Sequence, residues 1–329
     1  MIISRTPYRI SFFGGGTDYP EWYLKHTGEV ISTTIDKYLY ISCRNLPSFY
    51  EYKYRVIWNK MELAKKRGDI EHKVVKKMID HFKIKEGLDI VYAGDLPAQS
   101  GMGSSSSFVV GLMAALYELK KIKFNKKKLA TDSMFFEQKI LKEVVGSQDQ
   151  VATVYGGFQS IKFMKDGSFK IINLVKDANY LKTLSKRLIL VYTERKKNAG
   201  FIANKYVSIL DKKQEFMEQI SKYTNEAKKI IKEKELDEFG LLLNKTWEAK
   251  KRLSPHISNS EIDNIFKKAE KLGALGGKLL GAGGGGFILF YVPLKKRNTF
   301  INSFKKEQIV DFNFANKGSE IILNSYNNK

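Results

Sequence analysis

The sequence of 329 residues is poor in cysteine and histidine and contains no long hydrophobic run. Its single cysteine, Cys43, cannot form an internal disulfide, which favours a reducing compartment such as the cytoplasm. The N-terminus lacks the charged stretch and apolar core of a signal peptide, and the longest apolar helical stretch, residues 108–119, is too short to cross a bilayer. We therefore expect a cytoplasmic protein that is not embedded in a membrane.

Several common catalytic motifs are also absent. The four histidines (His26, His72, His81 and His256) lack H-E-x-x-H spacing, and one cysteine cannot support a cysteine-based zinc site. There is no Walker A motif G-x-x-x-x-G-K-[ST] and no H-R-D set of the protein kinases. P-loop enzymes, protein kinases and zinc enzymes of these types are therefore excluded.

Acidic residues are few relative to basic ones, with 35 Asp and Glu against 57 Lys and Arg and a net charge of +22. Such a charge attracts nucleotides, phosphorylated substrates, nucleic acids or acidic membranes. The lysines are spread over the whole chain, so most of this charge carries little specific information. Only residues 50–55 interleave aromatic and basic side chains, which leaves a nucleic-acid-binding protein as an alternative from another class.

The periodicity of the sequence predicts both strands and helices. Alternation of apolar and polar residues predicts strands at 2–13, 29–44 and 88–92, and Asp166-Gly167 predicts a hairpin turn. Helical spacing predicts helices at 104–120, where the first serines would serve as N-caps, and at 128–145. Further predicted elements are a strand at 187–193, helices at about 199–210, 212–234, 237–253 and 260–272, and strands at 286–292 and 319–323. We place a boundary near residues 180–186, which gives domains 1–183 and 184–329.

The segment from Pro97 to Ser107 carries the pattern of a phosphate-binding loop. Gly101 and Gly103 allow sharp turns and close approach of a ligand, and the predicted helix then presents free N–H groups. The serine hydroxyls of Ser104 to Ser106 can donate hydrogen bonds or coordinate Mg²⁺. The plainer alternative is a serine-capped helix after a flexible loop.

A second segment, Lys278 to Phe287, belongs to a stretch with seven glycines between residues 276 and 286. It formally contains G-x-G-x-x-G, but the dinucleotide-binding fingerprint needs a helix after the glycines. Here the glycines precede Phe287 to Val292, which reads as a strand. We expect the glycines to permit close approach of another backbone or a ligand, because glycine is otherwise costly.

The third segment runs from Arg9 to Pro20, where an apolar strand ends in three glycines and a Thr-Asp pair. Asp18 is a candidate ligand for the hydroxyls of a substrate. The alternative is a turn in which Asp18 accepts hydrogen bonds from nearby backbone.

These three segments, in this order, resemble the GHMP kinases, which include galactokinase, homoserine kinase and mevalonate kinase. Arg9 to Tyr19 aligns without a gap on the sugar-kinase opening R-V-N-L-I-G-E-H-T-D-Y, and Pro97 to Ser107 matches P-x-x-x-G-L-G-S-S-A. Lys278 to Phe287 matches the C-terminal glycine-rich motif. The resemblance implies an N-terminal α+β domain similar to one in a ribosomal protein, a ferredoxin-like α+β C-terminal domain, and ATP bound between them.

The same resemblance implies roles for individual residues. Asp149 would be the base that accepts the substrate's hydroxyl proton, and Arg9 would pair with it and stabilise the phosphoryl group. The ATP phosphates would be bound by Gly101, Gly103, Ser104, Ser105 and Ser106. Mg²⁺ would be bound by Ser105 and Glu137. The remaining substrate-binding candidates are Gly15, Gly16, Thr17, Asp18, Gly283 and Gly284.

Departures from the galactokinase pattern bear on the substrate. Gly15 and Gly16 replace Glu-His, which removes a carboxylate expected to bind the sugar. The string F-G-G-G-T-D-Y-P looks most like the family's kinases for D-glycero-D-manno-heptose 7-phosphate. Those enzymes act at the anomeric hydroxyl in surface polysaccharide synthesis. Fucokinase-type enzymes are the alternative.

We expect ATP, Mg²⁺ and a sugar phosphate as ligands, with no nucleic acid or membrane partner and with a homodimer left open. Arg195 is the first candidate for holding a substrate phosphate, and Lys250, Lys251 and Arg252 are the second.

Overall fold

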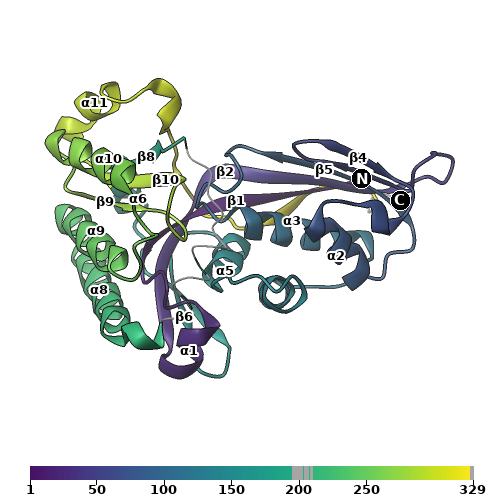
Figure 1. Ribbon diagram of the computed structural model, residues 1–329, viewed down its shortest axis with the longest axis horizontal. Helices are drawn as coiled ribbons and strands as arrows, with labels where there is room; N and C mark the ends of the chain where they lie inside the picture. The colour runs from purple at the N-terminus through teal and green to yellow at the C-terminus, as the bar shows by residue number, and fades with distance from the viewer. Residues whose placement is uncertain (195–202, 204–206, 208–209, 327–329) are drawn as a thin grey trace.

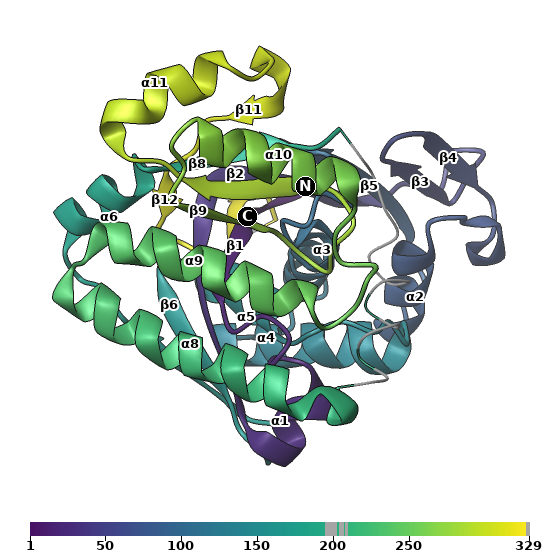
Figure 2. The same cartoon turned by 60° about the vertical axis from the view of Figure 1, so that its left-hand side comes forward.

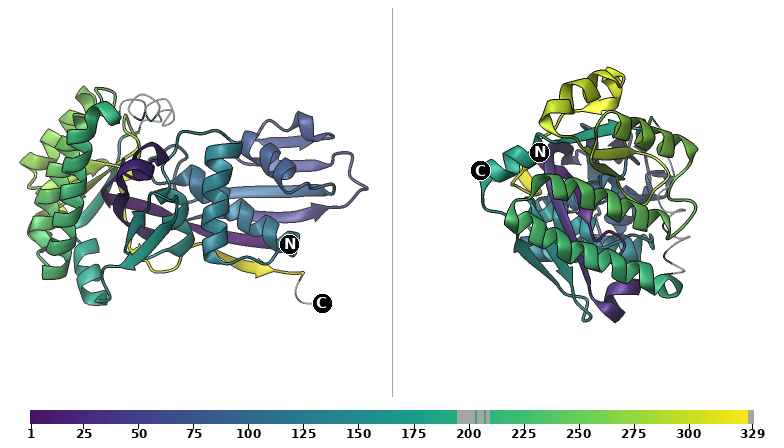
Figure 3. Two further views of the ribbon diagram at one scale, coloured as in Figure 1. Left: turned by 90° about the horizontal axis from the view of Figure 1, so that it is seen from below. Right: turned by 90° about the vertical axis from the view of Figure 1, so that its left-hand side faces the viewer.

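Two β-sheets organise the chain in the computed structural model, which describes residues 1–194, 203, 207 and 210–326. Figure 1 shows the first sheet extending to one end of the molecule and the second sheet at the other end, covered by helices. Strand β1 and the last residues that the structure describes lie near each other at the far end of the first sheet, where Ser325 Oγ and the Met1 amino group are hydrogen-bonded (Figure 3).

The first sheet has nine strands, with a main order of β13-β1-β2-β5-β3-β4 and with β6, β7 and β12 attached through β2. Its strands are β1 (Ile2–Phe13), β2 (Gly28–Leu46), β3 (Tyr54–Ile57), β4 (Met61–Ala64), β5 (Gly87–Gly94), β6 (Gln159–Phe163), β7 (Phe169–Asn173), β12 (Phe314–Ala315) and β13 (Glu320–Asn324). The long β2 pairs with β1 over residues 31–43, with β5 over residues 39–46 and with β6 over residues 28–32. The strands predicted at 2–13, 29–44 and 88–92 and the Asp166-Gly167 hairpin are confirmed.

The second sheet has four antiparallel strands in the order β11-β8-β10-β9. They are β8 (Leu188–Tyr192), β9 (Gly276–Leu279), β10 (Phe287–Tyr291) and β11 (Ile309–Val310). Figure 2 shows α8 (Gln214–Glu233) and α9 (Leu236–Lys251) side by side; α9 contacts β9 of this sheet, and α8 contacts β1 and β2 of the first sheet. The helices α10 (Ser260–Lys271) and α11 (Leu294–Asn302) complete this part of the chain.

The remaining helices belong to the first half of the chain. They are α1 (Pro20–His26), α2 (Lys73–His81), α3 (Ser104–Leu119), α4 (Lys126–Phe135), α5 (Gln148–Tyr155) and α6 (Ala178–Ser185). The periodicity did not reveal α1, α2, α5 or α6, which have 7 to 9 residues each. None of the helices formed by the described residues has the length and apolar character needed to span a membrane.

Helix α3 forms the centre of the first half. Every residue from Ser106 to Tyr117 is buried, because α3 packs on β1 and β2 on one side and on α4 and α5 on another. The sequence predicts one apolar face, whereas the structure buries α3 all round, as expected for a helix with a high apolar content. Burial on all sides fixes the position of the helix N-terminus, which begins at Ser104.

The helix predicted at 128–145 ends earlier than expected. It continues from α4 into a π-helical turn at Phe136–Ile140, and the backbone of Lys142 then takes a φ of 56°. The prediction of a helix up to Val145 is therefore wrong by five residues. A π-turn changes the direction of the side chains that follow it, which matters for Glu137 below.

The C-terminal part of the chain returns to the first sheet. β12 pairs with β2, and β13 pairs with β1 next to the N-terminus. The boundary expected near residues 180–186 coincides with α6 and the turn before β8. The division into 1–183 and 184–329 stays a prediction about folding units, and the helix expected at 199–210 falls largely outside the described residues.

The glycine-rich segment after β9 packs directly on the loop before α3. The Phe287 N–H donates to the Ser100 carbonyl oxygen at 3.0 Å, and a Cβ at Gly286 would lie 2.4 Å from that oxygen. A Cβ at Gly281 would lie 2.7 Å from the Cα of Gly101. The expectation of a close backbone approach is confirmed, and the partner is the protein's own phosphate-loop backbone.

This contact predicts a stability effect. Gly286→Ala places a methyl group inside van der Waals distance of Ser100 and requires a φ of 100°, which alanine rarely adopts. We expect the variant to lose about 1–3 kcal/mol in free energy of unfolding, measured by urea denaturation. Gly68→Ala is the matched control, because no described atom lies within 4 Å of its added Cβ. Equal stability of the two variants would contradict the proposed packing constraint.

Candidate functional site

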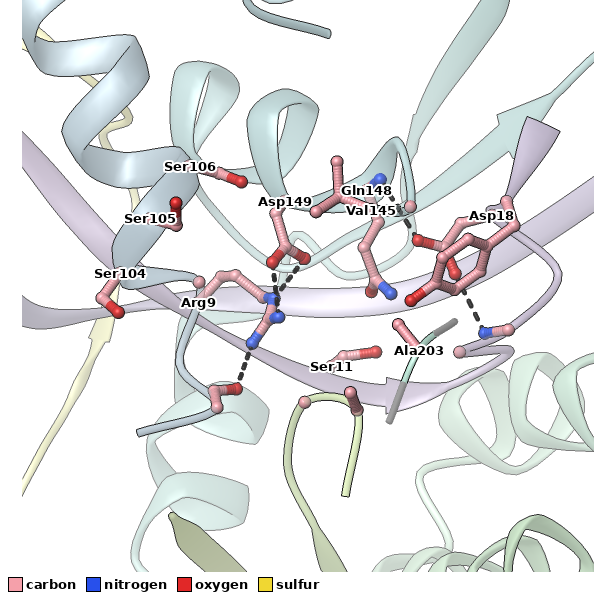
Figure 4. A pocket seen from close by; sticks show the side chains of 18 of the residues that line it. Arg9, Ser11, Asp18, Ser104, Ser105, Ser106, Val145, Gln148, Asp149 and Ala203 are labelled. Carbon is pink, nitrogen blue, oxygen red and sulfur yellow. Dashed lines mark hydrogen bonds and ion pairs between the residues drawn. The ribbon is translucent and has the colours of Figure 1, made fainter. Parts of the chain in front are cut away.

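A cleft of about 200 Å³ lies where the first turn of α3, the first turn of α5, the end of β1 and the β9–β10 loop meet. Ten of the predicted site residues line it: Arg9, Gly15, Gly16, Asp18, Gly101, Gly103, Ser104, Ser105, Ser106 and Asp149. Residues far apart in sequence, from positions 9 to 282, are thus brought together. Figure 4 shows the labelled side chains from β1, α3 and α5 around this space.

Arg9 and Asp149 form a bidentate ion pair in the cleft. Arg9 Nε donates to Asp149 Oδ1 and Arg9 Nη2 to Asp149 Oδ2, each at 2.7 Å, while Nη1 donates to the Gly101 carbonyl oxygen at 2.7 Å (Figure 4). The Arg9 side chain is 5% exposed and that of Asp149 is 23% exposed, so Asp149 keeps access to the cleft. Asp149 lies in the first turn of α5, where the helix dipole favours a negative charge.

A register shift in β1 explains how Arg9 reaches this position. The pairing of β1 with β2 is irregular between Pro7 and Arg9, and the Arg9 N–H instead donates to the Met102 carbonyl oxygen at 3.1 Å. A bulge of this kind bends the strand and redirects a side chain. Both the backbone and the side chain of Arg9 therefore bind the loop that precedes α3.

The loop before α3 has the geometry of an anion site. Gly103 is the N-cap residue and has a φ of 78°, so the chain turns sharply before Ser104. No side chain caps the helix, which corrects the expectation that the serines act as N-caps. The N–H groups of Ser104 to Ser106 therefore have neither an intrahelical nor a side-chain acceptor among the described residues, and they lie at the cleft with the positive end of the helix dipole.

Glu137 is buried beneath this helix start rather than on the surface. It is fully buried in the π-helical turn, and its carboxylate accepts hydrogen bonds from Ser106 Oγ at 2.8 and 3.1 Å and from Gln150 Nε2. Burial, the largest effect, raises the pKa of Glu137 to about 8 against these hydrogen bonds. The hydroxyl in contact with Glu137 belongs to Ser106, whereas Ser105 lines the cleft.

This arrangement suits a small divalent cation. No cationic side chain among the described residues forms an ion pair with Glu137, and Gln150 Oε1 is buried beside it without a partner among them. The described residues contain no group of three or more His, Cys, Asp or Glu side chains that could bind a metal. Mg²⁺ is commonly held by one or two carboxylates together with substrate phosphates, so a single buried carboxylate near an anion site fits it.

Asp18 connects the glycine turn after β1 to the start of α5. Its Oδ1 accepts from the Gly16 N–H at 2.9 Å and its Oδ2 from the Gln148 N–H at 3.4 Å, and its carbonyl oxygen accepts from the Ser147 N–H at 2.8 Å. Burial raises the pKa of Asp18, and the nearby Asp149 charge adds to the effect. A Cβ at Gly146 would lie 1.8 Å from Asp18 Oδ2, so glycine at 146 permits this contact.

Three other predicted site residues, Thr17, Gly283 and Gly284, do not line the cleft. Thr17 is fully buried, and its hydroxyl donates to the backbone oxygens of Gly14 and Glu29. Gly283 and Gly284 pack on Ile257, whose carbonyl oxygen accepts from the Gly284 N–H at 2.9 Å, and they do not line the cleft. Arg195 lies outside the described residues.

Two lysines that line the cleft, Lys250 and Lys278, are buried, which the sequence did not predict. Lys250 Nζ donates to the Gly281 carbonyl oxygen at 2.5 Å, and Lys278 Nζ donates to the carbonyl oxygens of Ser11 and Phe12, each at 2.9 Å. Burial, followed by the Arg9 charge, lowers the pKa of Lys250 to about 8. Burial also lowers the pKa of Lys278, with the Lys250 charge as the next cause.

Comparison with known proteins agrees with this geometry. Residues 69–157 match the model for the GHMP kinases N terminal domain, and residues 227–309 match that for the GHMP kinases C terminal. The chain is 30% identical to the D-glycero-alpha-D-manno-heptose 7-phosphate kinase of Campylobacter jejuni, over 96% of this chain and 97% of that protein. It is 25% identical to the bifunctional fucokinase/GDP-fucose pyrophosphorylase of Arabidopsis thaliana, over 86% of this chain and 29% of that protein.

Among solved structures, a D-glycero-D-manno-heptose 1-phosphate kinase from Bacteroides thetaiotaomicron superposes with a TM-score of 0.80 at 21% identity, covering 98% of this chain and 99% of that one. The chain belongs to the GHMP kinase family. It is an ATP-dependent phosphotransferase that acts on an alcohol group, and within the family it is a sugar kinase. The α+β GHMP kinase fold with N- and C-terminal domains, expected from the resemblance, is thereby confirmed, and kinases of this family use ATP and Mg²⁺.

The buried state of Glu137 predicts a pH effect on stability. Because its pKa is about 8 in the folded protein and 4.5 ordinarily, the folded state holds a proton that the unfolded state releases between these values. The stabilisation from this group is fully present below about pH 4.5, and it is lost progressively as the pH rises to about 8. Urea denaturation in EDTA should show a smaller fall across this window in Glu137→Gln than in the wild type. Identical pH profiles would refute the buried protonated state.

Proposed function

We propose that the chain phosphorylates the anomeric hydroxyl of D-glycero-D-manno-heptose 7-phosphate, using the γ-phosphoryl group of MgATP and giving the 1,7-bisphosphate. The observation that carries this proposal is the 30% identity, along nearly the full length of both chains, to a heptose 7-phosphate kinase. The cleft supports it, because no side chain occupies positions 15 and 16, where galactokinases carry Glu-His. A role in supplying nucleotide-activated heptose for surface polysaccharides follows from that product.

Asp149 and Arg9 would carry the chemical step. Asp149 would accept the proton of the attacking hydroxyl, since its carboxylate lines the cleft. Arg9 orients this carboxylate by donating a hydrogen bond to each of its two oxygens. The Arg9 guanidinium has five N–H donors, and three are engaged by Asp149 and Gly101. The others are available to the phosphoryl group, where fixed positive charge lowers the barrier to transfer.

The start of α3 would bind the triphosphate. The backbone N–H groups of Ser104 to Ser106 and the turns at Gly101 and Gly103 suit phosphate oxygens. Glu137, with the hydroxyl of Ser105 at the same helix start, would hold Mg²⁺. When bound, the ion offsets negative charge on the phosphates.

Substrate binding would involve the turn after β1 and the buried cations. Gly15, Gly16 and Asp18 line the cleft, and so do Lys250 and Lys278. Arg195 remains the proposed contact to the distal phosphate, and Lys250 is the alternative cation for it. Both would favour a phosphorylated acceptor over a neutral hexose.

The substrate assignment predicts a ranking of sugars. With MgATP, kcat/KM should be highest for heptose 7-phosphate and about tenfold or more lower for fucose and galactose, because a charge-assisted contact to the distal phosphate is worth about 1.5–3 kcal/mol. ADP release across a panel of sugars and sugar phosphates measures it. A preference for fucose would instead support a fucokinase-type enzyme. Salt-sensitive binding to RNA without ADP release on any sugar would support the nucleic-acid-binding alternative.

The proposed base predicts a kinetic signature. Asp149→Asn should lower kcat by about 10²–10⁴-fold, because a positioned base contributes that much, while the Kd for ATP stays near the wild-type value. Asp166→Asn is the matched control: Asp166 is exposed in the β6–β7 turn, and Asn-Gly is equally suited to that turn. Turnover of Asp149→Asn near that of the control would remove Asp149 from the chemistry.

A further inference from the structure

Three polar side chains from separate parts of the chain converge on Gly15. A Cβ built on Gly15 would lie 3.6 Å from Ser11 Oγ, 3.7 Å from Lys278 Nζ and 3.9 Å from Gln148 Nε2. Ser11 comes from β1, Lys278 from β9 and Gln148 from the first turn of α5, and all of them line the cleft. In Figure 4 the side chains of Ser11 and Gln148 approach the same part of the pocket.

These groups have hydrogen-bonding capacity that the described protein does not satisfy. Ser11 is 5% exposed and Gln148 is 8% exposed, yet neither Ser11 Oγ nor Gln148 Oε1 has a hydrogen-bond partner among the described residues. Lys278 is bound by two backbone carbonyl oxygens, and no carboxylate of the described residues forms an ion pair with it. Buried polar atoms are nearly always paired, so unpaired atoms that line a cleft point to a ligand.

The glycine at position 15 supports the same conclusion. Gly14 and Gly16, on either side, have φ values of 81° and 109° and need glycine for their backbone conformation. Gly15 does not have a positive φ, and the three neighbours of an added Cβ would be at ordinary van der Waals distance. Neither the backbone nor the packing therefore requires glycine at 15, and the space beside it is left for a ligand group.

We propose that Ser11, Gln148 and Lys278 form a subsite around Gly15 that binds a hydroxyl group of the acceptor sugar, other than the reacting one. A hydroxyl group can both donate and accept a hydrogen bond. It could donate to Gln148 Oε1, which lacks a donor among the described residues, and accept from the Lys278 ammonium group or the Gln148 amide N–H. A phosphate dianion cannot donate to Gln148 Oε1. The inference rests on the proposed function only in that the acceptor is a sugar.

The test fills the subsite without straining the fold. Gly15→Ala should raise the Kd of the accepted sugar, measured by calorimetry, by about tenfold to a hundredfold, and Ser11→Ala by a smaller factor. The Kd for ATP and the unfolding temperature should stay unchanged in both. The matched controls are Gly68→Ala and Ser4→Ala, the latter a buried serine on the same strand whose Oγ donates to Gly111 outside the cleft. Unaltered sugar binding in Gly15→Ala would overturn the proposal.

Deoxy analogues of the accepted sugar make the assignment specific. In the wild type, one analogue should lose about tenfold or more in affinity, whereas Gly15→Ala should bind that analogue and the parent sugar almost equally. If every analogue lost the same factor in both proteins, the hydroxyl subsite would be refuted. If Gly15→Ala impaired only phosphorylated sugars, the subsite would bind the phosphate instead, and the hydroxyl assignment would fall.

The test of the subsite can fail independently of the test of the proposed substrate. If the wild type accepts another sugar but not heptose 7-phosphate, the proposed substrate is wrong while the subsite is still tested with the accepted sugar. If heptose 7-phosphate is accepted but Gly15→Ala binds it normally, the subsite alone is wrong. A wild-type protein that binds no sugar would overturn both.

Discussion

The hydrogen bonds of Arg9 are the interaction on which the arrangement of this site depends. Its side chain joins Asp149 at the start of α5 to the Gly101 carbonyl oxygen, and its backbone N–H joins β1 to Met102. One buried residue therefore fixes the base, the phosphate loop and the central strand relative to each other. Because a guanidinium has a rigid planar set of donors, the geometry of all three is determined together.

Close backbone contact between the two glycine-rich segments complements this interaction. The β9–β10 loop lies against residues 100 and 101, with the Phe287 N–H donating to the Ser100 carbonyl oxygen. The second sheet is thus held at the phosphate loop by main-chain atoms, which side chains at Gly281 or Gly286 would separate. Gly281 and Gly286 of the C-terminal segment thus support the loop that would bind phosphate, whereas Gly283 and Gly284 pack on Ile257.

Features with a local cause could be predicted from the sequence, and features with a tertiary cause could not. The glycine and serine pattern before α3 predicted a helix start suited to phosphate, and alternation predicted β1 and β2, because these signals depend on neighbouring residues. The burial of Glu137 depends on a π-turn, which helical periodicity cannot reveal. The sequence analysis did not identify Ser11 and Gln148 as site residues. Their neighbouring residues give no sign of whether a buried polar side chain lines a cleft or is hydrogen-bonded within the protein. A lysine between glycines and leucines at 278 was the one available signal of a buried cation.

The charges in the cleft explain why its lysines are held by backbone rather than by carboxylates. Arg9, Lys250 and Lys278 face only Asp18 and Asp149 among the described lining residues, so positive charge is in excess. Burial lowers the pKa of both lysines, because an ammonium group without an anion is less stable in a buried position than in water. A carboxylate partner would relieve this cost but would cancel the field in the cleft. Carbonyl oxygens of Phe12 and Gly281 instead orient the ammonium groups and leave their net charge for the phosphates of the ligands.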